Sequence, residues 1–122
     1  RGTTRDGVPV GPRPGPTVVV STAPPGGVVV VPAGARRVRV TGCTAIDLCL
    51  VADGSAGAWH NLDRSGTHVH DVAGGLALLA AAGGVALTPD GEPLVLRPDT
   101  ETLIRFAAGT PDVARELLRA FA

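Results

Sequence analysis

The sequence predicts an α/β protein with a mainly parallel sheet and flanking helices, and three observations lead to this prediction. Residues 17–22 form a run rich in β-branched side chains, residues 72–82 carry no charge, and residues 111–121 repeat apolar side chains at helical spacing. The chain has 122 residues and 44% hydrophobic content, the size of one ordinary domain. We therefore expect residues 1–122 to fold as a single α/β unit.

The first third of the chain alternates turn signals with short extended runs. Residues 1–16 are rich in Gly and Pro, and Asp6-Gly7 is typical of a tight turn, so we expect the end of a hairpin whose first strand is missing. The run 17–22 predicts a strand that is buried on both faces. Residues 28–31 form a second apolar run, and residues 37–40 alternate charged and apolar side chains, like a strand with one face in water.

Two helices are predicted in the middle of the chain. The first begins at Thr44, where Asp47 completes a capping-box pattern, and ends at Gly54. The second spans residues 72–82, and because it has no charged face we expect it to be covered on several sides. Asp71 falls in its first turn, where the helix dipole favours an ionised carboxylate. Such a carboxylate suits a hard metal ion, although on local sequence alone it could simply cap the helix.

The last third of the chain predicts short strands and a surface helix. Strands are expected at residues 58–60 and 103–108, and residues 85–96 predict a hairpin around a Pro-Asp-Gly turn. Thr110 can cap the final helix, and Pro111 suits its first position. An apolar stripe on one side of this helix, opposite charged residues, places it on the protein surface.

Composition and charge exclude two classes of partner. The formal net charge is zero and the 11 basic residues, all Arg, are scattered apart from one short cluster, so we exclude nucleic acid and acidic membrane surfaces. No segment is long enough to span a bilayer, and we expect a cytoplasmic protein. Cys43 and Cys49 are expected to be small buried side chains without a disulfide. Because the sequence contains no Met, we expect it to be part of a longer product.

Four short motifs, in order along the chain, carry a resemblance to a known family. They are Asp6-Gly7-Val8-Pro9, the segment Gly42 to Gly54, His70-Asp71-Val72-Ala73-Gly74-Gly75 with the later Ala82-Gly83-Gly84, and Phe106-Ala107-Ala108-Gly109-Thr110-Pro111. Together they resemble the C-terminal half of the inositol monophosphatase family of magnesium-dependent sugar phosphatases. The third motif is similar to the second signature of that family, Trp-Asp-x-Ala-Ala-Gly.

The resemblance implies a fold and a set of site residues. The fold is the layered sugar-phosphatase-like one, with the helix over residues 72–82 between sheets and the N-terminal half missing from this chain. The resemblance also implies that Asp71 binds a catalytic Mg²⁺ ion and that Gly42, Cys43 and Thr44 lie against the substrate. Asn61 stands where relatives often carry an acidic residue that contacts a sugar hydroxyl, and it is equally well explained as a turn residue.

The chain also departs from the family pattern. The first signature of the family, Asp-Pro-x-Asp-Gly-Thr, is absent, and Asp53-Gly54-Ser55 is only a superficial echo of it. Pro24 to Gly27 occupy a region where relatives place a helix, and His70 replaces the common Trp. Metal-assisted phosphoryl transfer needs several carboxylates, and this chain offers one, Asp71. We therefore expect no catalytic residue in this chain and no activity from it alone.

The sequence thus predicts the C-terminal half of a Mg²⁺-dependent phosphomonoesterase that hydrolyses a small sugar or polyol phosphate. The alternative is a non-catalytic remnant of the same fold that serves as a binding or assembly module. A second alternative is a zinc site formed by His68, His70 and Asp71, with His60 nearby. Histidines such as His68 and His70 more commonly line the mouth of a site or face solvent. Without a covering layer the helix over residues 72–82 should expose an apolar patch, which favours self-association, for example as a homodimer.

Overall fold

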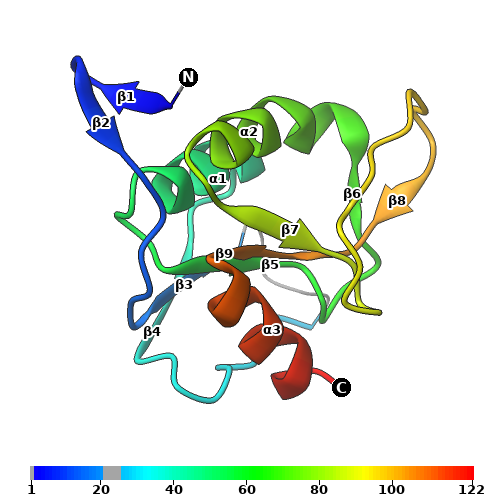
Figure 1. The fold of residues 1–122 in the computed structure, drawn as a ribbon. Helices are drawn as coiled ribbons and strands as arrows, with labels where there is room; N and C mark the ends of the chain where they lie inside the picture. Colours follow the sequence, from blue (N-terminus) through cyan, green and yellow to red (C-terminus); the bar gives the residue numbers. More distant parts are fainter. Residues whose placement is uncertain (1, 21–25) are drawn as a thin grey trace.

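The computed structural model describes residues 2–20 and 26–122, and its centre is a five-stranded sheet with helices on both faces (Figure 1). In chain order the elements are β1 (Thr3–Arg5), β2 (Val8–Val10), β3 (Thr17–Val20), β4 (Arg37–Val40), α1 (Thr44–Ala52), β5 (Ala58–His60), β6 (Thr67–His68), α2 (Val69–Ala81), β7 (Val85–Leu87), β8 (Leu103–Ile104), β9 (Ala107–Gly109) and α3 (Pro111–Ala120). Helices α1 and α2 pack together on one face of the sheet, and α3 covers the other. The predicted α/β class with flanking helices is confirmed.

The sheet is mixed, with the strand order β4-β3-β5-β9-β7. Strand β3 pairs in parallel with β4 and β5, whereas β9 pairs antiparallel with β5 and β7. Four strands therefore run in one direction, which confirms the predicted mainly parallel sheet, and β9 runs against them as one antiparallel strand that makes the sheet mixed. The strand expected at residues 103–108 is divided between β9 and β8, which pairs with β6 in a separate ribbon. An antiparallel strand needs no helical crossover, and no helix lies between β7 and its antiparallel neighbour β9 in the chain.

The N-terminal residues form a hairpin in which β1 pairs antiparallel with β2. At its turn Asp6 and Gly7 have φ values of 53° and 77°, the left-handed conformations that a tight type I′ turn requires. The expectation that the first strand of this hairpin is missing is therefore wrong. The predicted strand over residues 17–22 is β3, and residues 21 and 22, like Pro24 and Pro25 of the Pro-Gly region, lie outside the described residues.

Alternate side chains of the central strands enter two separate cores. Val19 and Trp59 belong to the core beneath α1 and α2, and their neighbours Val18 and Ala58 belong to the core beneath α3. All four are buried, as predicted for β3 and as expected for strands that are covered on both faces. The indole of Trp59 packs against the ring of Phe106, with ring centroids 4.6 Å apart, so an aromatic pair forms the centre of the first core.

Helix α2 rests on α1, but its outer face is uncovered. The helix ends before Gly83, as predicted, and only Val72, Gly75 and Leu79 within it are buried. Leu78, on the opposite side, is 43% exposed. The prediction that this helix is covered on several sides is wrong for the described residues, because α1, β1 and β7 contact it but leave all of its residues except Val72, Gly75 and Leu79 half-buried or exposed. The exposed side of α2 matches the other expectation, that this helix exposes an apolar patch when no further layer of structure covers it.

We predict that the chain self-associates through the side of α2 that carries Ala73, Ala77 and Ala80, which together with residues 84–87, 93–94 and 96 lines an apolar groove of about 420 Å³. The variant Ala77→Glu should shift the sedimentation distribution towards monomer, because Ala77 is exposed and glutamate keeps a high helix propensity. Ala120→Glu adds the same charge to an exposed position on α3, and we expect it to change nothing. A wild-type chain that sediments as a monomer at every concentration would contradict this prediction.

Both cysteines are free thiols, as predicted, but they differ in exposure. Cys43 is half-buried and Cys49 is exposed, so the expectation that both are buried is wrong for Cys49. The reason is that α1 buries a different side, formed by residues such as Leu48 and Val51. Within residues 2–20 and 26–122, no helix has both the length and the apolar character needed to cross a membrane.

Candidate functional site

The N-termini of α1 and α2 open onto one cleft with a volume of about 660 Å³. The cleft is formed by the start of α1, the segment that leads into α2, and β8. Its lining residues are Gly42, Cys43, Thr44, Ala45, Ser65, Gly66, Thr67, His68, His70, Asp71 and Leu103. The first amide groups of a helix have no partner within the helix and carry the positive end of its dipole. Two such helix starts at one cleft favour the binding of an anion such as a phosphate group.

The structure brings most of the predicted site residues together. Asp71 comes from α2, and Gly42, Cys43 and Thr44 come from the segment that begins α1, yet all of them line the same cleft. Ser65 and Thr67, whose hydroxyl-bearing side chains lie in the segment before α2, were not predicted from the sequence. The signal that could have found them is the polar composition of residues 61–67, shortly before a helix.

Asp71 lies in the first turn of α2, and its side chain is 53% exposed at the cleft. Its Oδ1 atom is 3.8 Å from Nε2 of His70, close enough for attraction when the imidazole is protonated. The N-cap of α2 is His68, and among the described residues the Asp71 carboxylate accepts no capping hydrogen bond. Capping does not occupy this carboxylate, and its oxygens are free to contact a ligand in the cleft.

The start of α1 contributes Gly42, Cys43, Thr44 and Ala45 to the lining of the cleft. Gly42 has a φ of 85°, a left-handed turn that a side chain would strain, and it directs the chain into the helix. Cys43 is the N-cap and has an extended backbone, but its side chain makes no capping hydrogen bond. Its own amide donates to Oγ1 of Thr41 at 3.2 Å. The amides that follow at the start of α1 are therefore not blocked by a capping side chain.

Asp47, the other carboxylate of α1, has a structural rather than a binding position. It is fully buried, and its carboxylate accepts hydrogen bonds from the Thr41 hydroxyl and, at 3.3 Å, from Nε1 of Trp59. Burial raises the pKa of Asp47, and the two hydrogen bonds partly oppose that rise. The predicted capping box is thus not formed by this residue. Asp47 instead links the segment before α1 to the buried indole beneath the helix.

Asn61 does not line the cleft, and its amide is used inside the protein. Its Nδ2 donates to Oγ1 of Thr67 and to the carbonyl of Ile104, both at 2.9 Å, and its Oδ1 accepts from the amide of Phe106 at 2.8 Å. The residue is completely buried. These bonds hold the loop after β5 against β6 and the segment between β8 and β9. The contact with a substrate hydroxyl that the resemblance implies for Asn61 stays a prediction.

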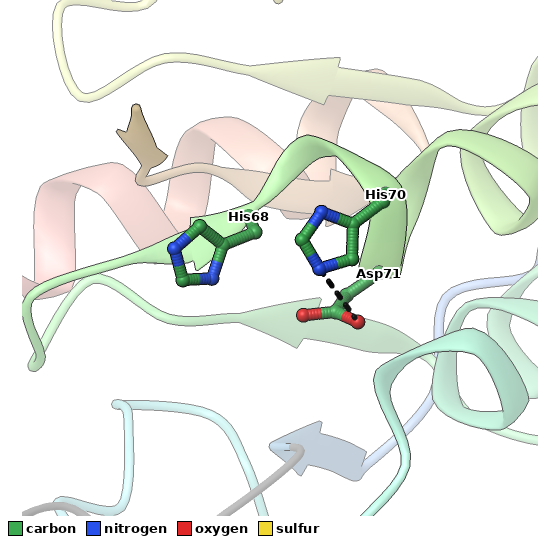
Figure 2. A group of neighbouring side chains, drawn as sticks. All are labelled: His68, His70 and Asp71. Carbon is green, nitrogen blue, oxygen red and sulfur yellow. Dashed lines mark ion pairs between the residues drawn. The ribbon is translucent and has the colours of Figure 1, made fainter. Parts of the chain in front are cut away.

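His68 and His70 lie side by side above the carboxylate of Asp71 (Figure 2). Their rings are stacked, with centroids 5.2 Å apart and an interplanar angle of 15°. One ligand atom from each of the three side chains lies within 4.8 Å of the others. His60 is remote from this group, because its ring is fully buried and packs against Phe121 after α3. The expectation that His60 lies near the other two histidines is wrong, since β5 buries its side chain towards α3.

The described residues of the cleft supply few ligands that suit Mg²⁺. Mg²⁺ prefers six oxygen ligands in octahedral geometry and usually keeps several waters. The cleft offers one carboxylate, Asp71, and two imidazole rings, because the carboxylate of Asp47 is buried elsewhere. Asp71 fits Mg²⁺ as a single oxygen ligand, and the rest of such a site would have to come from outside the described residues.

Comparisons with known proteins agree on one family. The sequence profile of the inositol monophosphatase family matches residues 21–120. Among solved structures, a hypothetical protein from Pyrococcus horikoshii with similarities to inositol-1 monophosphatase superimposes with a TM-score of 0.84 at 19% identity, over 98% of this chain and 49% of that one. Inositol monophosphatase from Anabaena gives a TM-score of 0.76 at 25% identity, over 98% and 50% of the two chains.

Inositol monophosphatase II from Staphylococcus aureus gives a TM-score of 0.71 at 21% identity, over 98% of this chain and 48% of its own. The chain therefore spans about half the length of these solved structures. A comparison with curated protein sequences finds no match. Since the family profile covers most of the sequence and the fold agrees over nearly all of it, the chain belongs to the inositol monophosphatase family.

Proposed function

We propose that this chain forms the C-terminal half of a Mg²⁺-dependent phosphomonoesterase that acts on a small sugar or polyol phosphate. The observation that carries the proposal is the joint cleft, in which two helix N-termini and the Asp71 carboxylate meet. A carboxylate beside a phosphate site is unfavourable unless a cation lies between the two negative groups. Asp71 is therefore assigned as one ligand of that cation, and Gly42, Cys43 and Thr44 as the wall that faces the substrate.

The comparisons support the substrate class. One structural neighbour, inositol monophosphatase II at 21% identity, has been solved with inositol monophosphate bound. A cleft of about 660 Å³ has room for a ring of this size with its phosphate. The polar groups on its walls include the hydroxyls of Thr44, Ser65 and Thr67, which suit a polyol.

The remaining catalytic parts are proposed to lie outside this chain. Phosphoryl transfer needs several metal-binding carboxylates and a positioned water, and the described part of the cleft contains the carboxylate of Asp71 only. We expect the 122-residue chain by itself to release no phosphate from a phosphate monoester.

The test is phosphate release from inositol 1-phosphate as a function of Mg²⁺ concentration, with the longest protein that the gene encodes. We expect Asp71→Asn to lower kcat/KM by about 100-fold or more, because loss of a direct metal ligand should exceed the 10- to 100-fold effect of outer-shell changes. Asp112→Asn is the matched control, since Asp112 also lies in the first turn of a helix but on α3, away from the cleft. We expect it to retain full activity.

The same assay separates the proposal from its alternative, a non-catalytic remnant that acts as a binding or assembly module. The single carboxylate of the cleft is the observation in favour of that alternative. Equal activity of Asp71→Asn and the wild type would overturn the role assigned to Asp71. Absence of activity with a panel of sugar and polyol phosphates, from a protein that includes residues upstream of this chain, would favour the remnant.

A further inference from the structure

Three exposed or half-buried side chains at the mouth of the cleft converge in a way that the proposed Mg²⁺ site does not explain. One donor atom from each of His68, His70 and Asp71 lies within 4.8 Å of the other two, and Figure 2 shows the three side chains together. His68 ends β6, and His70 and Asp71 belong to the first turn of α2. The change from strand to helix at Val69 places both rings on the same side of the chain, where they stack.

The chemistry of these donors selects a different ion from Mg²⁺. Imidazole nitrogen is a preferred ligand of zinc and other late first-row divalent ions, whereas Mg²⁺ favours oxygen. Two histidines and one carboxylate are also a donor set with which proteins bind such ions while leaving further positions open. The carboxylate of Asp71 can bind either ion, but the two imidazoles suit only zinc and similar late first-row ions.

The geometry requires only small side-chain movements. Ligands of a tetrahedral zinc ion lie about 2.0–2.2 Å from the metal, which places them about 3.3 Å from one another. Nε2 of His70 and Oδ1 of Asp71 are already 3.8 Å apart. Their side chains are 61% and 53% exposed, and His68 is half-buried, so the rings can turn without displacing the core. Apart from their contacts with one another, these three side chains have no polar partner among the described residues.

We propose that His68, His70 and Asp71 form a binding site for a zinc-class divalent transition-metal ion, with its open coordination positions directed to the cleft. The site needs only side chains of this chain, so it does not depend on the phosphatase activity proposed above. Because Asp71 is shared, a zinc-class ion and Mg²⁺ compete for it, and the two histidines decide the competition in favour of the zinc-class ion.

The experiment is a titration of the metal-free 122-residue chain with Co²⁺, followed by its visible d–d absorption. Four- and five-coordinate Co²⁺ absorbs far more strongly than the hydrated ion, so the bands report coordination by the protein directly. We expect one Co²⁺ per chain, its displacement by Zn²⁺ and no displacement by a large excess of Mg²⁺. His68→Ala and His70→Ala should each weaken binding by about 100-fold or more, as expected for loss of a direct ligand.

Two control variants make the result specific. Asp112→Asn removes a first-turn carboxylate that has no neighbouring histidine, and Cys43→Ser removes the thiol that lines the same cleft; both should bind Co²⁺ like the wild type. Thermal unfolding without metal should be unchanged in both histidine variants, because neither side chain belongs to a core. Three results would overturn the proposal. They are Co²⁺ bands that persist in the double variant His68→Ala/His70→Ala, bands that vanish in Cys43→Ser, and bands that Mg²⁺ abolishes at concentrations similar to that of Co²⁺. None of these readouts measures phosphate release, so failure here leaves the proposed function standing.

Discussion

Replacing Gly75 by alanine is expected to destabilise the protein by about 1–3 kcal/mol, the usual cost of overpacking a tight contact. A methyl group at this position would lie 2.6 Å from Cβ of Leu48, where α2 crosses α1. A Cβ atom is tied to its backbone, so the two helices would have to separate rather than one side chain rotate. The free energy of unfolding in urea measures the effect.

Gly74, one residue earlier on the same helix, supplies the matched control. It is exposed, and a methyl group there would meet nothing within 4 Å. Gly74→Ala should therefore stabilise the protein by about 0.5–1 kcal/mol through the lower entropy of the unfolded chain. Leu48→Gly removes the Cβ atom that would clash, so the double variant with Gly75→Ala should be more stable than the sum of the single effects predicts. Equal responses of Gly74→Ala and Gly75→Ala would show that the helix crossing is not close.

Acid is expected to destabilise the protein through His60 by about 3 kcal/mol between pH 6.5 and pH 4. The His60 ring is fully buried, its Nδ1 accepts the amide hydrogen of Leu62 at 3.2 Å, and its Nε2 has no hydrogen-bond partner within residues 2–20 and 26–122. Burial lowers the pKa of His60 from 6.5 to about 4, while Asp63 acts to raise it and Arg64 acts to lower it further. The unfolded chain therefore takes up a proton at a higher pH than the folded protein does. Stability from this residue is complete above pH 6.5 and declines as the pH falls towards 4.

The measurement is the free energy of unfolding at several pH values for the wild type and for His60→Asn. The Asn side chain can still accept the Leu62 amide hydrogen but cannot titrate. Between pH 6.5 and pH 4, the free energy of unfolding of His60→Asn should therefore fall by about 3 kcal/mol less than that of the wild type. The carboxylates titrate in every variant, so the difference between the variants isolates His60. Parallel curves for the wild type and His60→Asn would contradict the assignment.

Local elements of this fold could be predicted because their causes lie within a few residues of one another. The helix after Thr110 forms as expected, with the threonine hydroxyl accepting the amide hydrogen of Val113 and Pro111 at the first position. The run of β-branched residues became β3, and the Asp6-Gly7 pair formed its turn. The family resemblance rested on short motifs that occur in the same order as in the family, and the family profile confirms it.

Features that depend on residues far apart in the chain could not be predicted in this way. The position of β9 between β5 and β7 is set by pairings such as Trp59 with Ala108, which nothing in either local sequence indicates. The burial of Asp47 and Asn61 has the same origin. Asp47 is bonded to Trp59, and Asn61 is bonded to Phe106, 45 residues away. Asp and Asn are also common in turns and helix caps. Only the distant partners of Asp47 and Asn61 therefore distinguish a buried structural role from a turn or a cap.

The sequence by itself thus determined the α/β class and the three helices, and the family resemblance implied the site residues at the starts of α1 and α2. Tertiary structure alone decided which carboxylate stays available, because burial removed Asp47 and left Asp71 half exposed. It also decided that His68 and His70 meet at that carboxylate while His60 lies beneath α3. The physical reason is that hydrophobic periodicity and capping are properties of neighbouring residues, whereas the burial and the coordination of a polar group depend on what the folded chain brings to it.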